Sequence, residues 1–288
     1  MTQKNNDELL LRESIEARYE KLTLKDDFMF GKIMQNERNC IDMLERLTGN
    51  KIEGIKSNIS QKSVRVTNDS KGVRYDVYVE DYSDNIYDAE MQQSGGNKDI
   101  ETLPKRTRFY QGMVDLNLLE SGGDYRELKN SYIIFICTFD PFKKGLYCYE
   151  FENVCKDDST LKLLDGRKIL IYNTKGKKIN VSKETLDFLK YIETNKVCDD
   201  YTERLSHDVT KARKNKEWRV EYMKTLLHDM DVRREGREEG REEGREEGRE
   251  EKAYAVVMNM LRKGMSILDI CELTECSEEY VEKVKRSL

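Results

Sequence analysis

The sequence predicts a mixed α/β domain followed by a helical C-terminal extension. Residues 71–93 alternate twice between apolar and polar side chains, with a turn-forming run between the two halves, as paired strands do. A continuous apolar run at 131–137 has the length and β-rich composition of a central buried strand. Helical periodicity lies before the first strands, between the hairpin and the apolar run, and after residue 183. The predicted order is therefore helix, three strands, helix and strand.

The composition limits the class of protein. A chain of 288 residues has room for one domain of about 150–200 residues with appendages. Charged residues make up 37%, no apolar run approaches the roughly 18–20 residues of a membrane span, and the N-terminus lacks the pattern of a signal peptide. Seven cysteines without a C-x-x-C motif and two histidines argue against disulfide, zinc and paired-histidine sites. We expect a cytoplasmic protein without a membrane partner.

The domain is expected to begin after a polar lead, residues 1–21, and to occupy residues 22–233. A helical apolar pattern starts at Asp26 and Asp27 and stops at Gly49. Helix capping and the helix dipole explain carboxylates at this position without any further role. Residues 52–67 follow with the weak alternation of a first strand.

The hairpin carries the candidate chemistry. Its alternation predicts two half-buried strands, and a loop centred near Ser83 places Asp76 opposite Glu90, with Cβ atoms about 5 Å apart. Gln92 lies two residues beyond Glu90 and so projects from the same face. Two carboxylates and an amide oxygen form a seat for a hard divalent cation, because Mg²⁺ prefers oxygen ligands. The alternative is a solvated acidic hairpin.

The next helix carries a basic cluster. Pro104 is expected to start it, and Phe109, Met113 and Leu116 to form its buried stripe. Positive charges in the first turns of a helix oppose its dipole, so a phosphate partner would explain them, although a solvated basic face explains them equally well. The basic side chains are Lys105, Arg106 and Arg108.

After the central strand at 131–137, short strands are expected at 146–151 and 168–173, and residues 183–230 are mainly helical. Residues 234–252 then repeat the unit REEG without any apolar side chain. Like residues recur at i,i+4, and each glycine costs a helix about 1 kcal/mol relative to alanine. This tract is predicted to be a marginal, fraying helix that acts as a spacer.

Residues 253–288 predict a small module of three short helices, with Ser266 and Ser277 as caps of the second and third. The spacing is compatible with a helix-turn-helix, but Glu278 and Glu279 at the start of the third helix would repel DNA. A packing or self-association module, and hence a homo-oligomer, is the alternative. Most of the net charge of −5 lies in residues 234–288, so any DNA contact of the nearly neutral remainder must use local patches.

Four strings in order resemble the PD-(D/E)XK nuclease superfamily, in its transposase-associated branch of recombination-promoting nucleases. The resemblance covers about residues 22–195. It implies a restriction-endonuclease-like αβββαβ core and a metal-dependent DNA endonuclease that promotes recombination or transposition, with Mg²⁺ or Mn²⁺ held by Asp76 and Glu90. The strings are LTLKDDFMF (22–30), YDAEMQ (87–92), RTRFYQGMVD (106–115) and SYIIFICTFDPF (131–142).

The resemblance also implies roles for individual residues. Gln92 stands where most of the superfamily has lysine, and since an amide carries no charge, a second metal or a cation such as Lys98 or Lys105 would have to stabilise the transition state. The first helix of the family implies Asp27 as an accessory carboxylate, and Arg106 and Arg108 are candidates for contacts with DNA phosphates. The rival hypothesis is a catalytically silent module of a mobile element that binds nucleic acid or a partner.

Overall fold

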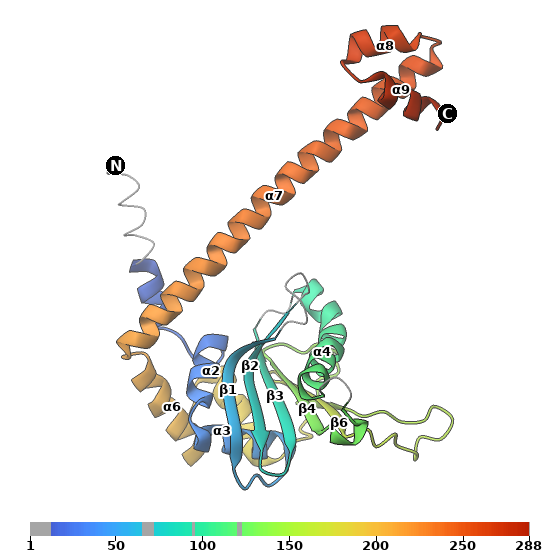
Figure 1. Ribbon diagram of the computed structural model, residues 1–288. Helices are drawn as coiled ribbons and strands as arrows, with labels where there is room; N and C mark the ends of the chain where they lie inside the picture. Colours follow the sequence, from blue (N-terminus) through green and yellow to red (C-terminus); the bar gives the residue numbers. More distant parts are fainter. Residues whose placement is uncertain (1–12, 65–71, 94–95, 120–122, 288) are drawn as a thin grey trace. The chain divides into compact units, whose positions relative to one another are not determined.

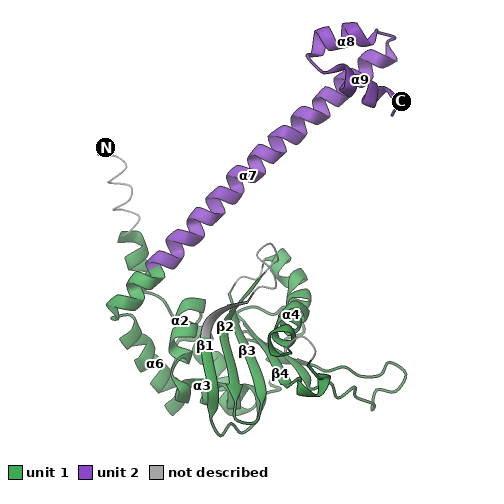
Figure 2. Ribbon diagram, in the orientation of Figure 1, with its two compact units in different colours: residues 1–222 green, residues 223–288 purple. Residues whose placement is uncertain are grey.

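The computed structural model describes residues 13–64, 72–93, 96–119 and 123–287. The chain forms two compact units, Met1–Tyr222 and Met223–Leu288 (Figure 2). Helix α7 (Lys216–Arg262) begins in the first unit and continues into the second.

The first unit is built on a six-stranded mixed sheet with the strand order β1-β2-β3-β4-β6-β5 (Figure 1). Strand β2 pairs antiparallel with β1 and with β3. Strands β3, β4 and β6 run parallel, and β5 is an edge strand antiparallel to β6. The mixed α/β class predicted from the sequence is confirmed, and so are the central position of β4 and the short strands after it. The strands are β1 (Ile55–Val64), β2 (Val73–Asp81), β3 (Asn85–Gln92), β4 (Asn130–Cys137), β5 (Cys148–Phe151) and β6 (Arg167–Asn173).

Helices cover both faces of this sheet. Helix α4 lies against β4 on one face, and α2 and α3 contact β1 to β3 on the other (Figure 1). Helices α5 and α6 pack on α2 and α3, and the turn η1 precedes β4. The bounds are α2 (Asp27–Met34), α3 (Glu37–Thr48), α4 (Asn97–Leu118), η1 (Tyr125–Glu127), α5 (Lys183–Thr194) and α6 (Asp200–Ala212).

The predicted hairpin register is confirmed, since Val77 pairs with Ala89 and Val79 pairs with Tyr87 around the turn at Ser83. The prediction that its strands are half-buried is wrong. Nearly every side chain of β2 and β3 is buried, Asp76 and Glu90 included, because helices pack on both faces. Asp76 and Glu90 therefore lie inside the domain, whereas Arg74 at the start of β2 is exposed.

The apolar pattern expected as one helix up to Gly49 forms two. Asn36 interrupts it and accepts a hydrogen bond from the backbone N–H of Asn39, which starts α3. Asp26 precedes α2, but its carboxylate accepts from the N–H of Thr23 (2.8 Å) and makes no cap bond to the helix. Asp27 is the acidic residue of the first turn of α2, where the helix dipole favours it.

Helix α4 begins at Asn97, seven residues before Pro104, which lies in its interior. Lys105, Arg106 and Arg108 therefore lie in the middle of the helix, and the dipole argument does not apply to them. The predicted apolar stripe is also wrong in part, because Met113 is buried while Phe109 and Leu116 are exposed. The buried face instead holds Leu103, Thr107, Gln111, Met113 and Val114.

The polar lead is partly core. Residues 13–19 are helical, Ile15 and Tyr19 are buried, and the Tyr19 hydroxyl donates to the carbonyl oxygen of Ala212 (2.8 Å). The domain therefore begins before residue 22. The first twelve residues lie outside the described residues.

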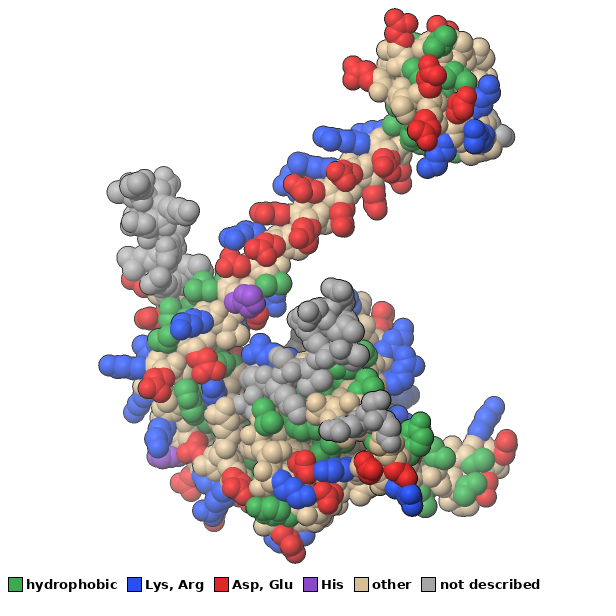
Figure 3. Space-filling view, in the orientation of Figure 1, with side chains coloured by type: hydrophobic (Ala, Val, Ile, Leu, Met, Phe, Trp, Pro, Cys, Tyr) green, Lys and Arg blue, Asp and Glu red, His purple; other side chains and the backbone are tan. Residues whose placement is uncertain are grey.

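In the second unit, α7 runs without a break through the repeat tract, which was expected to fray. Figure 3 shows charged side chains along the repeat tract of α7 and no hydrophobic ones, between atoms of the backbone and of other residues in tan. The predicted caps are confirmed: Ser266 precedes α8 (Ile267–Thr274) and Ser277 precedes α9 (Glu278–Lys285). None of the helices in the described residues has the length and apolar content needed to cross a membrane. The core of the module is Val257, Ile270, Val281 and Val284.

Candidate active site

Asp76 and Glu90 face each other where the two strands of the hairpin separate. The backbone ladder between β2 and β3 reaches the pair Val77 and Ala89. Beyond it, the backbone N–H of Asp76 donates to Glu90 Oε1 (2.8 Å), and the N–H of Met91 donates to Asp76 Oδ2 (3.0 Å). Each carboxylate thus replaces a ladder bond to the opposite strand. These reciprocal bonds hold both side chains in place on strands rather than on loops.

A third carboxylate, Asp88, lies beside this pair. It is two residues before Glu90 on β3 and so projects from the same face, which α4 covers. The side chain is completely buried, and its oxygens accept no hydrogen bond from an N–H or hydroxyl group; its partner is the Glu90 carboxyl, to which it can bond through a shared proton. A buried carboxylate whose partner is a second carboxyl is uncommon and calls for a proton or a cation between the two.

Burial disfavours the ionised forms of all three carboxylates, and a hydrogen bond with Glu90 partly offsets this for Asp88. Burial raises the pKa of each well above its usual range. The next cause is a neighbouring negative charge for two of them: Glu90 acts on Asp76, and Asp88 acts on Glu90. The positive charge of Arg106 opposes this effect at Asp88 and Glu90. The cluster therefore favours a proton or a cation.

Arg106 reaches this cluster from α4. Its Nη1 atom donates to Gln92 Oε1 (2.6 Å), and its guanidinium lies over the rings of Phe135 and Tyr110, at 5.2 and 5.6 Å from the centroids. Stacking on two rings and a bond to the amide fix the orientation of the guanidinium. The neutral Gln92 side chain is thus paired with a cation.

The other predicted residues lie in different places. Asp27 is close enough to Asp76 that its negative charge raises the pKa of Asp76, so the structure brings this accessory candidate to the site. Lys98, Lys105 and Arg108 are exposed on α4. Of the basic residues named from the sequence, Arg106 is the one whose contacts join it to Gln92 and whose charge acts on Glu90.

The donor set suits a hard divalent cation. All the acidic side chains offer oxygen, whereas the Cys137 side chain, which is paired with Gln92 across β3 and β4, is a soft thiol that hard cations do not favour. Within the described part of the chain, no group of three His, Cys, Asp or Glu side chains is arranged so that it could hold a metal ion. A cation between Asp76 and Glu90 would thus need further ligands from backbone oxygen or water.

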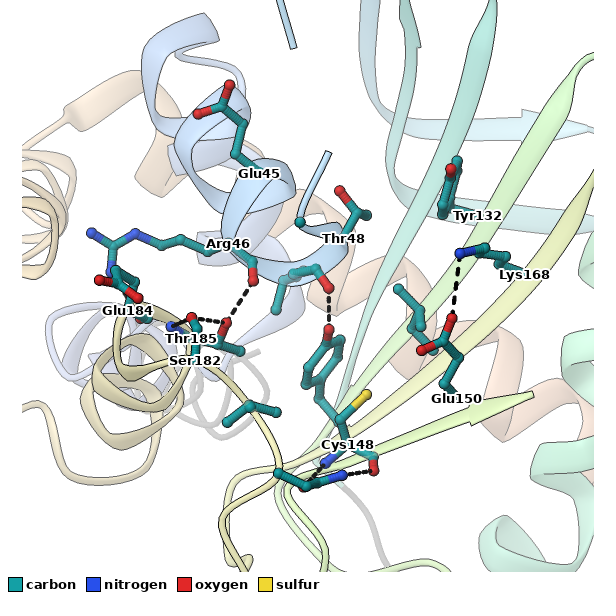
Figure 4. Close-up of a pocket in the computed structure, with 16 residues that line it drawn as sticks. Glu45, Arg46, Thr48, Tyr132, Cys148, Glu150, Lys168, Ser182, Glu184 and Thr185 are labelled. Atoms are coloured by element: carbon teal, nitrogen blue, oxygen red, sulfur yellow. Dashed lines mark hydrogen bonds and ion pairs between the residues drawn. The ribbon is translucent and has the colours of Figure 1, made fainter. Parts of the chain in front are cut away.

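A cavity of about 420 Å³ on the opposite side of the sheet is a weaker candidate (Figure 4). Both of its cationic side chains are already paired, since Arg46 Nη1 lies 2.7 Å from Asp199 Oδ2 and Lys168 Nζ lies 3.4 Å from Glu150 Oε1. The Cys148 thiol at its wall is not an activated nucleophile, because burial raises its pKa to about 11.

Two features of the site were not predicted from the sequence: the role of Asp88 and the pairing of Arg106 with Gln92. Asp88 lies inside the string YDAEMQ and shares the alternation of Glu90, so the period of two could have identified it. The pairing of Arg106 with Gln92 had no comparable signal, because it depends on how α4 packs against the sheet.

The chain matches no family model, no curated protein and no solved structure. The interpretation of the site rests on its geometry and on the resemblance of the four strings.

Proposed function

We propose that this protein is a metal-dependent DNA endonuclease that hydrolyses phosphodiester bonds during recombination or transposition. The observation that carries the proposal is the set of three buried carboxylates, Asp76, Asp88 and Glu90, at the point where the central hairpin opens. The order α2–α3, β1–β2–β3, α4, β4 supports an αβββαβ core of the restriction-endonuclease type.

In this proposal, Asp76 and Glu90 hold the cation, and Asp88 adds negative charge behind them. When bound, Mg²⁺ or Mn²⁺ lowers the pKa of a water and neutralises charge on the scissile phosphate. Gln92 orients water through its amide. Arg106, fixed by Gln92 and by two rings, supplies the positive charge that the superfamily's lysine would bring. Lys98 and Lys105 are not needed for this role.

The test is incubation of the purified protein with supercoiled plasmid, in Mg²⁺, in Mn²⁺ and in EDTA. We expect nicked and linear products only with the metals. The Asp76→Asn variant should be inactive but folded, because an amide oxygen can still accept from the N–H of Met91. Glu53→Gln, at an exposed position, is the matched control and should cleave like the wild type.

Equal nicking by the wild type and by Asp76→Asn would remove this site from the reaction. A wild type that shows neither cleavage nor metal-dependent stabilisation would favour the catalytically silent binding module instead, because a cation that binds only the folded state must raise its stability.

A further inference from the structure

A second cavity, of about 710 Å³, lies between α4 and the start of β2. Its size is that of a small-molecule or single-nucleotide site. It adjoins the candidate active site, because Arg106 and Tyr110 line it. The positive charge of Arg74 lowers the pKa of Asp76, and that of Arg106 lowers the pKa of Glu90.

The described wall of this cavity is basic. Four of its twelve lining residues are Arg or Lys, and no carboxylate is among them. Figure 3 shows Lys and Arg side chains on the surface over α4. No ion pair links the exposed side chains of Arg74, Lys105 and Arg108 to a carboxylate of the described residues. This charge is complementary to a polyanion such as a nucleic-acid backbone.

The rest of the wall is apolar and open. Phe109 and Leu116 are 40% and 63% exposed, so the sheet does not need them for its core. Between them lies Gly112, where an added Cβ would meet no atom within 4 Å. Packing therefore does not require glycine here, although glycine is among the least favourable residues in a helix interior. Its effect is to leave space beside the ring of Phe109.

We infer that this cavity binds an unpaired nucleotide of a DNA strand, with its base stacked on Phe109 and its phosphates against Arg74, Lys105 and Arg108. Recognition of phosphate alone would need no apolar wall, whereas an aromatic ring with basic neighbours is the usual platform for single strands. In a continuous duplex the faces of the bases are covered by their neighbours and cannot reach this ring. The inference rests on the proposed function, and it makes single strands, flaps or bubbles the preferred substrate.

Binding is measured by fluorescence anisotropy in EDTA, so that no cleavage is needed. The probes are a short labelled single strand, the same sequence closed as a blunt hairpin duplex, and the RNA of that sequence. We expect the wild type to bind the single strand more tightly than the duplex. Phe109→Ala should weaken single-strand binding about 10-fold and change duplex binding less than about 2-fold. Phe109→Tyr, which keeps an aromatic ring, should bind the single strand like the wild type.

Gly112→Leu provides a second variant that removes no contact. It should occupy the space beside the ring of Phe109, keep the fold because that space is open, and weaken single-strand binding as much as Phe109→Ala does. Arg108→Gln should weaken binding to both probes and lower the salt dependence by about one ion. Tyr125→Ala, at an exposed aromatic outside the cavity, and Lys196→Gln, at an exposed lysine, are the matched controls.

Several outcomes would overturn the inference: no DNA binding, equal loss for single strand and duplex in Phe109→Ala, wild-type affinity in Gly112→Leu, or tighter binding of RNA than of DNA. Plasmid cleavage with any of these results would leave the proposed endonuclease standing. Selective single-strand binding without metal-dependent cleavage would support the cavity and reject the endonuclease.

Discussion

Replacing Glu90 by glutamine tests whether the buried carboxylates strain the metal-free protein. The change keeps the size of the side chain, and the remaining amide oxygen can still accept from the N–H of Asp76 (2.8 Å in the wild type). It removes one negative charge beside Asp88, whose oxygens accept no hydrogen bond from an N–H or hydroxyl group. The fold should survive, and the electrostatic cost should fall.

The magnitude follows from burial. Burial, and then the charge of Asp88, raise the pKa of Glu90, so the folded state binds this proton more tightly than the unfolded state does. The stability of the metal-free wild type must therefore fall as pH rises from the unfolded carboxyl pKa, about 4.3, through the higher pKa of the folded state. An ionised buried carboxylate costs several kcal/mol, and its stronger hydrogen bond returns about 1 kcal/mol.

At about pH 8 in EDTA, we expect Glu90→Gln to be more stable than the wild type by about 2 kcal/mol, or about 4–8 °C in melting temperature for a unit of this size. Near pH 4, below the unfolded carboxyl pKa of about 4.3, the difference should shrink towards zero, because Glu90 then binds its proton in both the folded and the unfolded state. Adding Mg²⁺ should raise the melting temperature of the wild type and not that of the variant. Trp218, the only tryptophan, belongs to the first unit, so its fluorescence follows that unit.

The control is Glu53→Gln, which removes an exposed glutamate and should melt with the wild type at both pH values. If Glu90→Gln melted at or below the wild-type temperature at pH 8, or if its gain were the same at pH 4, the argument from buried charge would be refuted.

Three further predictions concern the partner of Gln92 and the C-terminal unit. Arg106→Gln should lower plasmid nicking about 10- to 100-fold, because the guanidinium that would approach the phosphate is lost. Stabilisation by Mg²⁺ should remain, because Asp76 and Glu90 are unchanged. Arg126→Gln is the control, and an unchanged nicking rate in Arg106→Gln would count against the role of Arg106. Gln92→Lys alone should also reduce nicking, because the new ammonium group would lie against the guanidinium of Arg106. The double variant with Arg106→Gln should recover activity, and additive losses would argue against a shared role of the two residues. Removing everything after Asp231 should lower the mass per particle in light scattering and leave the melting curve followed by Trp218 unchanged. Deleting two REEG units should alter neither the mass nor the melting curve. An unaltered mass after the truncation would exclude self-association through residues 253–288.

The sequence determined the local pairing of the hairpin and the ends of several helices. A period of two and a short turn at Ser83 are enough to place Asp76 opposite Glu90, because both signals lie within one hairpin. Gly49, Ser266 and Ser277 mark helix ends through the positive φ of the first (72°) and the cap bonds of the two serines.

Only the tertiary structure decided which of these side chains are buried and which meet. Helices on both faces turned an apparently half-exposed hairpin into the centre of the domain, which changes Asp88 from a solvated acid to a buried one beside a second carboxyl group. The contact of Arg106 with Gln92 requires α4 to pack across the sheet, and the early start of α4 moves its basic residues from the first turn to the middle. These outcomes depend on the packing of separate elements, and no periodicity within one element contains that information.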